Sequence, residues 1–206
     1  MTLVGALDLA SVFVFALTGA LAASRAQLDI VGFVFIACLT AVGGGTLRDL
    51  LLDRPVIWVA QPLYLGVASG AAVLVFFTAH LLESRIRTLA WLDACALAVA
   101  VPAGTGVALG LGQPWPIVLV TGIVTGCMGG LMRDVVCNEV PLVLKQGELY
   151  VTCALAGAGA ALLATQVEQS QPLALAICAA VTLALRAGSL AFGWRLPVYK
   201  TRPPRR

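Results

Sequence analysis

The sequence predicts an all-α membrane protein with seven transmembrane helices, arranged as two inverted three-helix repeats plus a seventh helix. The first observation is composition: 60% of the 206 residues are hydrophobic, 11% are charged, and the mean hydropathy is +0.98. Soluble domains carry about 25% charged residues. The second observation is that apolar runs of about 20 residues, enough to cross a bilayer as a helix, follow one another along the chain. The third is an internal duplication.

Seven apolar runs, separated by short polar breaks, define the predicted spans. None of them alternates between apolar and polar positions, as the strands of a membrane β-barrel do. The first run lacks the preceding basic residues of a signal peptide, and Asp8 interrupts it, so we expect a retained helix. The spans are residues 3–23, 30–52, 62–82, 89–111, 115–137, 148–166 and 172–192.

Basic residues are concentrated in the connections after the first, third and fifth spans and behind the last span. Nine Lys and Arg residues lie on this side of the membrane, against one or two on the other side. Lys- and Arg-rich flanks stay in the cytoplasm, so the bias predicts an external N-terminus and a cytoplasmic C-terminus. The basic tail can contact anionic lipid headgroups. The nine residues are Arg25, Arg85, Arg87, Lys145, Arg195, Lys200, Arg202, Arg205 and Arg206.

Several function classes are not expected. The sequence has no nucleophile with a nearby base, no phosphate-binding loop and no paired carboxylates at catalytic spacing, so neither an enzyme nor a cofactor is predicted. The basic residues do not cluster on a soluble surface, which argues against nucleic-acid binding. Six cysteines lie inside the spans without a C-x-x-C pair, and we interpret them as small apolar residues rather than metal ligands. They are Cys38, Cys95, Cys127, Cys137, Cys153 and Cys178.

The chain matches itself after a shift of 85 residues, with one residue inserted late in the second copy. Each copy contains three spans, and because three is odd, the second copy must enter the membrane inverted. The matched positions are Asp8 with Asp93, Gly19 with Gly104, Gly44-Gly45 with Gly129-Gly130, Arg48-Asp49 with Arg133-Asp134, Pro55 with Pro141, and Tyr64 with Tyr150. The resulting units are residues 1–88, 89–170, a seventh helix at 171–193 and a basic cytoplasmic tail at 194–206.

Glycines interrupt the second and fifth spans. Three consecutive glycines in a helix weaken it by roughly 3 kcal/mol relative to alanine. A broken helix is tolerated at membrane depth only inside protein or beside water, so we expect a functional break whose carbonyl groups can coordinate a cation. The alternative is that these glycines only permit close helix packing. They are Gly43, Gly44 and Gly45 in the second span, and Gly126, Gly129 and Gly130 in the fifth.

Charged residues at membrane depth require partners. Asp8 lies level with Arg48 near the outer side, and Asp93 lies level with Arg133 near the inner side, so we expect two ion pairs. Adjacent helical residues point about 100° apart, so Arg48 and Asp49 are not expected to pair with each other.

Arg186 stands alone late in the seventh span. It can join the inner charges through Glu139 or Glu148, and the sequence does not decide between them.

The segments GGGTLRDLL and GGLMRDVVCNEVP, with their flanking Asp, Pro and Tyr residues, resemble the trimeric intracellular cation (TRIC) channel family in its prokaryotic branch. The resemblance covers about residues 5–192. It implies a homotrimer in the prokaryotic inner membrane, with one pore per protomer for potassium and sodium between the glycine-broken second and fifth helices. Two positions depart from the family. Met128 replaces a third glycine, and Asn138 lies where the animal branch has a lysine, so phosphoinositide binding is not expected.

Two other classes of protein stay open. Inverted repeats with broken helices are also typical of secondary transporters, and some bacterial relatives have been linked to glycine transport. A structural or assembly protein without transport activity is the third class. The pathway residues predicted for the channel are the six glycines with Arg48, Asp49, Arg133 and Asp134, and the charge partners are Asp8, Asp93 and Arg186.

Overall fold

The computed structural model describes residues 2–81, 85–145, 148–167 and 170–197. The predicted spans are confirmed to within a few residues. In this part of the chain the elements are α1 (Leu3–Arg25), α2 (Ile30–Leu51), α3 (Ile57–Ala60), α4 (Leu63–Thr78), η1 (Ala79–Leu81), α5 (Arg85–Gly110), α6 (Trp115–Val136), η2 (Leu142–Leu144), α7 (Val151–Val167) and α8 (Gln171–Phe192).

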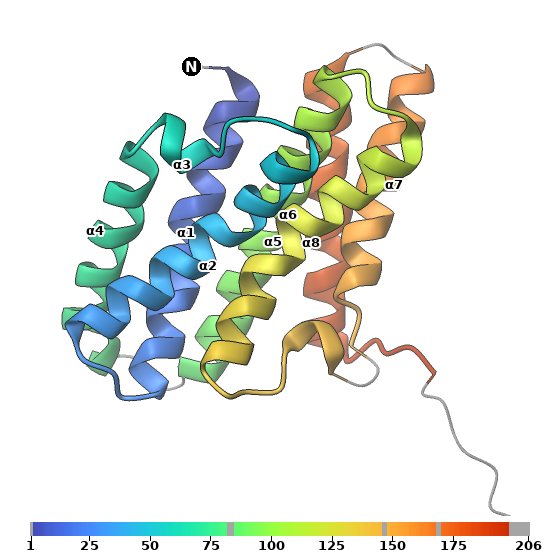
Figure 1. Cartoon of the computed structure of the whole chain (residues 1–206). Coiled ribbons are helices and arrows are strands. Elements are labelled where there is room, and N and C mark those ends of the chain that lie inside the picture. Colours follow the sequence, from blue (N-terminus) through green and yellow to red (C-terminus); the bar gives the residue numbers. More distant parts are fainter. Residues whose placement is uncertain (1, 82–84, 146–147, 168–169, 198–206) are drawn as a thin grey trace, which may run out of the picture.

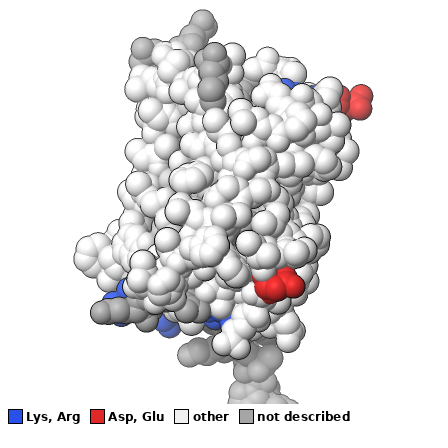
Figure 2. Space-filling model, turned by 90° about the vertical axis from the view of Figure 1, so that its left-hand side faces the viewer, with Lys and Arg blue, Asp and Glu red and all other residues white. Residues whose placement is uncertain are grey.

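The helices have the length and composition of a membrane protein. Six of those in the described residues are long and apolar enough to cross a bilayer, and α7 is an apolar helix of 17 residues. The sixth expected span, residues 148–166, is therefore shorter than predicted, because its first residues form an irregular segment. Figure 2 shows charged side chains toward the two ends of one face, with an uncharged band between them.

The helices form one bundle in which α2 and α6 cross at the centre (Figure 1). On one side α1 packs against α2, α4 and α5, and on the other α5 packs against α6 and α8. The helix α8 also packs against α7, so the helix that lies outside the predicted repeat closes the second half of the bundle.

The ends of α2 and α6 are built alike. Behind each helix one residue adopts a left-handed conformation, Asp53 with φ 50° and Asn138 with φ 55°. Asp and Asn are the residues other than glycine that tolerate this conformation best. The chain then turns back, and a short helical segment, α3 or η2, covers the end of the long helix.

The expected helix breaks are wrong. Both α2 and α6 continue as single α-helices through their glycines, from Ile30 to Leu51 and from Trp115 to Val136. The packing alternative explains the glycines at the crossing. A side chain at Gly44 would collide with the backbone carbonyl of Thr125, and one at Gly129 with the carbonyl of Thr40. Glycine has a weak helix propensity, but its lack of a side chain lets the two backbones touch, and this contact offsets the loss.

Of the predicted basic tail, residues 194–206, the structure describes residues 194–197. Its basic residues from Lys200 onward lie outside the described residues, so their expected lipid contact stays a prediction.

Candidate functional site: two buried charge clusters

The first cluster consists of Asp8, Arg48 and Asp49. The Arg48 guanidinium donates from Nη1 to Asp8 Oδ1 at 2.6 Å and from Nε to Asp49 Oδ1 at 2.9 Å. The second oxygen of Asp49 accepts a hydrogen bond of 2.9 Å from the backbone N–H of Ile57, at the start of α3. Arg48 is 1% exposed, so α1, α2 and the turn behind α2 together bury a complete ionic network.

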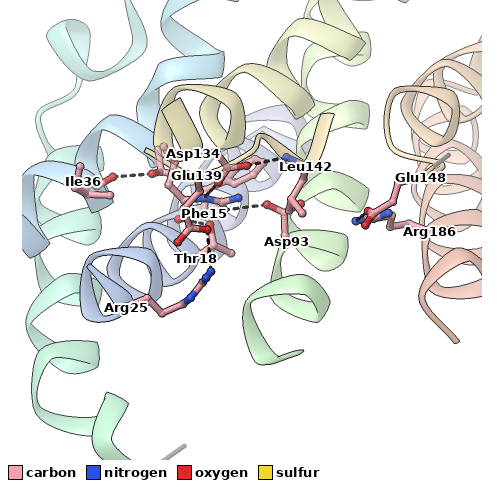
Figure 3. Close-up of polar contacts among 12 residues, drawn as sticks. Phe15, Thr18, Arg25, Ile36, Asp93, Asp134, Glu139, Leu142, Glu148 and Arg186 are labelled. Carbon is pink, nitrogen blue, oxygen red and sulfur yellow. Dashed lines mark hydrogen bonds and ion pairs between the residues drawn. The ribbon is translucent and has the colours of Figure 1, made fainter. Parts of the chain in front are cut away.

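The second cluster consists of Asp93, Arg133 and Asp134 and repeats this pattern. Arg133 donates from Nη1 to Asp93 Oδ1 at 3.0 Å and from Nε to Asp134 Oδ1 at 2.8 Å. Asp134 Oδ2 accepts from the backbone N–H of Leu142 at 2.9 Å. Figure 3 shows Asp134 beside its partner Leu142, and Asp93 on α5 pointing toward them.

The two predicted ion pairs, Asp8 with Arg48 and Asp93 with Arg133, are thereby confirmed. The expectation that Arg48 and Asp49 do not pair is wrong. The Cβ directions of adjacent residues diverge, but the arginine side chain is long enough to curve back along the helix. Its planar guanidinium then bonds two carboxylates from different edges.

Each cluster holds two carboxylates and one guanidinium, a formal charge of −1. Removing one partner from a buried ion pair destabilises a protein by about 3–5 kcal/mol. The hydrogen bonds from the Arg side chains and from the backbone at Ile57 and Leu142 stabilise the carboxylates in place of water. The clusters are therefore fixed, negatively charged points at opposite ends of the α2–α6 pair.

Two further ion pairs settle what the sequence left open for Arg186. Its Nη2 donates to Glu148 Oε2 at 3.0 Å, and its guanidinium lies 5.0 Å from the centre of the Tyr150 ring. Glu139 pairs instead with Arg25, Oε2 to Nη1 at 2.9 Å. Figure 3 shows Glu148 and Arg186 pointing toward each other, apart from Asp93.

Pockets lie at both ends of the bundle. A pocket of about 200 Å³ is lined by all three members of the first cluster, and a neighbouring pocket of about 510 Å³ shares Asp8 with it. At the other end, a pocket of about 490 Å³ is lined by Asp134 and by both ion pairs, Arg25–Glu139 and Arg186–Glu148. Between the two ends, Phe15, Leu97 and Val101 are buried in the core.

The remaining predicted glycines lie on the same two helices. Gly43 faces Met132 on α6, and Gly126 faces Leu97 and Val101 on α5. Gly45 and Gly130 occupy matched positions one turn before Arg48 and Arg133. Space for a Cβ exists at both, 3.7 Å from Ile57 Cγ2 at Gly45 and 3.4 Å from the Tyr150 hydroxyl at Gly130.

Sequence reasoning missed Thr40 and Thr125, which are central to the crossing. Thr40 on α2 contacts Gly19 of α1 as well as Gly129 of α6, and Thr125 in the second half contacts Gly104 and Gly44. Each threonine hydroxyl donates to a backbone carbonyl one turn earlier in its own helix, Thr40 to Ile36 and Thr125 to Thr121. The repeat could have revealed the two threonines, because Thr40 and Thr125 are also 85 residues apart.

Comparison with protein-family models gives a match to a family described as "Glycine transporter", over residues 5–80 and 90–166. Among curated proteins, the UPF0126 inner membrane protein YadS of Escherichia coli is 35% identical over 200 residues, covering 94% of each chain. A UPF0126 membrane protein of Vibrio cholerae is 35% identical over 199 residues, or 94% of this chain and 81% of the relative.

Among solved structures, a TRIC trimeric intracellular cation channel orthologue from Rhodobacter sphaeroides is 41% identical with a TM-score of 0.90. The match covers 94% of this chain and 100% of that one. A prokaryotic TRIC channel studied in 0.5 M KCl is 26% identical with a TM-score of 0.86, over 92% of this chain and 96% of that one. The bundle described above is thus the fold of these channels.

Proposed function

This chain belongs to the family that joins the UPF0126 inner membrane proteins with the prokaryotic TRIC channels, and we propose that it is a passive channel for monovalent cations, potassium and sodium. As in its relatives, its place is the bacterial inner membrane. The similar solved structures are those of cation channels, and we extend that activity to this protein.

The observation that carries the proposal is the excess of carboxylate in each buried cluster. Acidic groups along a pore favour cations over anions. Here one such group lies at each end of the α2–α6 pair, and each borders a pocket. The arginine of each cluster holds both carboxylates in place and balances only one of them, so each cluster favours a permeating cation over an anion.

The pathway follows α2 and α6 within each protomer. Its proposed lining is the glycine side of both helices together with Arg48, Asp49, Arg133 and Asp134. Gly44 and Gly129 hold the two backbones in contact at the crossing. Conduction therefore requires α2 and α6 to shift apart there, and the absence of a Cβ leaves this contact free to slide.

The proposed architecture is a homotrimer of protomers built from two inverted repeats, residues 1–88 and 89–170. The duplicated ion networks and the two segments of the family match, residues 5–80 and 90–166, support the repeat. The bias of basic residues supports an external N-terminus and a cytoplasmic C-terminus. The seventh helix and the basic tail complete the chain on the cytoplasmic side.

A second candidate function is secondary transport of a small amino acid such as glycine. The description of the matching family model favours it. So does the pocket of about 490 Å³, because it presents Arg25, Lys145 and Arg186 beside Asp134, Glu139 and Glu148, and a zwitterion carries both charges.

Flux in proteoliposomes separates these functions. A channel releases potassium down its gradient with no amino acid present, whereas a transporter takes up glycine slowly and saturably, driven by an ion gradient. Asp134→Asn keeps the size of the side chain and removes the excess charge of the second cluster, so we expect lower potassium flux. Glycine uptake without potassium release from the same preparation would contradict the channel.

A further inference from the structure

The two ends of the molecule differ in how deeply their pockets reach. At the first end, Asp8, Arg48 and Asp49 all line the pocket of about 200 Å³. At the second end, the pocket of about 490 Å³ reaches Asp134. Asp93 and Arg133 do not line it.

Tyr150 lies beside the Asp93–Arg133 pair of the second cluster. Its hydroxyl oxygen, Asp93 Oδ1 and Arg133 Nη2 all surround one point beside Gly130, at 3.4, 3.5 and 3.7 Å from the position of a Cβ there. Over its ring lies the guanidinium of Arg186, which lines the pocket. From the pocket lining to the Asp93–Arg133 pair, the order is therefore Arg186, Tyr150, Asp93.

Within the second cluster, the Asp93–Arg133 pair is fully buried and, unlike Asp134, does not line the pocket. Two polar atoms of this pair, Asp93 Oδ2 and Arg133 Nη2, are buried without a hydrogen-bond partner among the described residues. Each such atom carries a desolvation penalty of about 1–3 kcal/mol. Water that reached the pair would satisfy both atoms, so the closed arrangement needs something to hold it.

The first end has the equivalent tyrosine without this closure. Tyr64, the counterpart of Tyr150, lines the pocket of about 510 Å³ together with Asp8. The difference comes from α8, which lies outside the repeat and supplies Arg186 at the second end.

The segment behind α8 reinforces the position of Arg186. We call residues 193–197 the C-terminal strap. Gly193 turns the chain back with φ 68°, Trp194 packs onto Gly188, and Ser189 Oγ donates to the Trp194 carbonyl at 3.1 Å. Arg195 then forms an isolated antiparallel bridge with Glu148, the partner of Arg186.

We propose that the Tyr150 ring is the barrier that closes the second end of the pathway, and that Arg186 is its positioning residue, held by Glu148 and the C-terminal strap. The inference deepens the proposed function by naming the closed end of the same pathway. The barrier itself is defined by water access to the second cluster, so it can be tested apart from ion flux.

Cys127 is a natural reporter of that access. It is fully buried on α6, within electrostatic reach of Asp93 and Arg186. Hydroxyl-radical labelling of the full-length protein in nanodiscs, read by mass spectrometry, measures how readily bulk water reaches it. We expect low labelling in the wild type. Glu148→Ala, which frees Arg186, and Tyr150→Ala, which removes the ring, should each raise it several-fold.

Three variants are matched controls. Tyr150→Phe keeps the ring and should label as the wild type does. Tyr64→Ala changes the counterpart at the open end, and Arg25→Gln breaks the other ion pair of the same pocket. Both should leave Cys127 labelling unchanged. Gel filtration checks that every variant remains assembled, and thermal unfolding of Glu148→Ala is measured beside the wild type, because this variant leaves the buried Arg186 without its charge partner.

The outcomes separate the barrier from the channel. Wild-type labelling of Cys127 in both Glu148→Ala and Tyr150→Ala overturns the barrier, as does an equal rise in Tyr64→Ala. A rise in labelling with a matching several-fold rise in potassium flux supports the barrier and the channel together. A rise in labelling without any potassium flux supports the barrier and contradicts the proposed function.

Discussion

At the scale of single residues, the arginines organise this protein. Each of Arg48 and Arg133 joins a carboxylate of a neighbouring helix to the carboxylate that follows it in sequence. That aspartate in turn accepts from the backbone at the start of a short helix. One guanidinium therefore fixes three chain segments, which a lysine, with its single charged point, cannot do.

The residue-scale prediction compares two arginines in ion pairs of different burial. Arg133→Gln leaves Asp93 buried without its charge partner, so we expect a loss of stability of about 3–5 kcal/mol. Arg25→Gln breaks a pair whose side chains are 27% and 31% exposed, where about 0–1 kcal/mol is typical. Thermal unfolding of the two purified variants measures the difference. Equal melting temperatures would show that the buried cluster does not stabilise the fold.

At the scale of elements, the sequence predicted the helices and the ion pairs better than it predicted the backbone at the crossing. Hydropathy and helix length predict the spans, and matching depth predicts the partner of Arg48. Glycine runs have two physical outcomes, a broken helix or a close contact, and the choice depends on the partner helix. Thr125 and Thr40 supply that partner surface. The helix propensity of α2 or α6 alone does not show that the other helix packs there.

The element-scale prediction tests this close contact with two adjacent glycines. Gly44→Ala places a Cβ against the Thr125 carbonyl and forces α2 away from α6, which we expect to destabilise the protein by about 1–3 kcal/mol. Gly45→Ala meets Ile57 Cγ2 at an ordinary 3.7 Å, so the better helix propensity of alanine should stabilise it by up to about 1 kcal/mol.

Thermal stability of these two variants tests whether Gly44 is needed for the close contact. Opposite shifts in melting temperature support the contact. If both alanines stabilised the protein alike, the glycines would not be needed for the approach of α2 and α6.

At the scale of the whole molecule, duplication gives both ends the same ionic network, and α8 makes them unequal. The two clusters share their connectivity, while α8 adds Arg186 at one end. This asymmetry could not be derived from the repeat, because the repeat predicts equal ends. The sequence offered Glu139 and Glu148 equally as partners of Arg186, and the choice depends on how α7 and α8 pack.

Orientation in the membrane is the first prediction at this scale. The basic bias predicts a cytoplasmic C-terminus. A fluorescent reporter that matures only in the cytoplasm should shine when fused there, and a phosphatase that requires the periplasm should stay inactive. The reverse pattern would place the strap and Arg186 on the external side and contradict the predicted orientation.

Single-channel recording tests the central claim most directly. The purified protein, placed in a planar bilayer between unequal potassium chloride solutions with no amino acid present, should give unitary currents. Because each cluster carries an excess carboxylate, the currents should reverse close to the potassium equilibrium potential and persist when sodium replaces potassium. Silent bilayers from a preparation that accumulates glycine in liposomes, or currents that reverse at the chloride potential, would contradict a passive channel for monovalent cations.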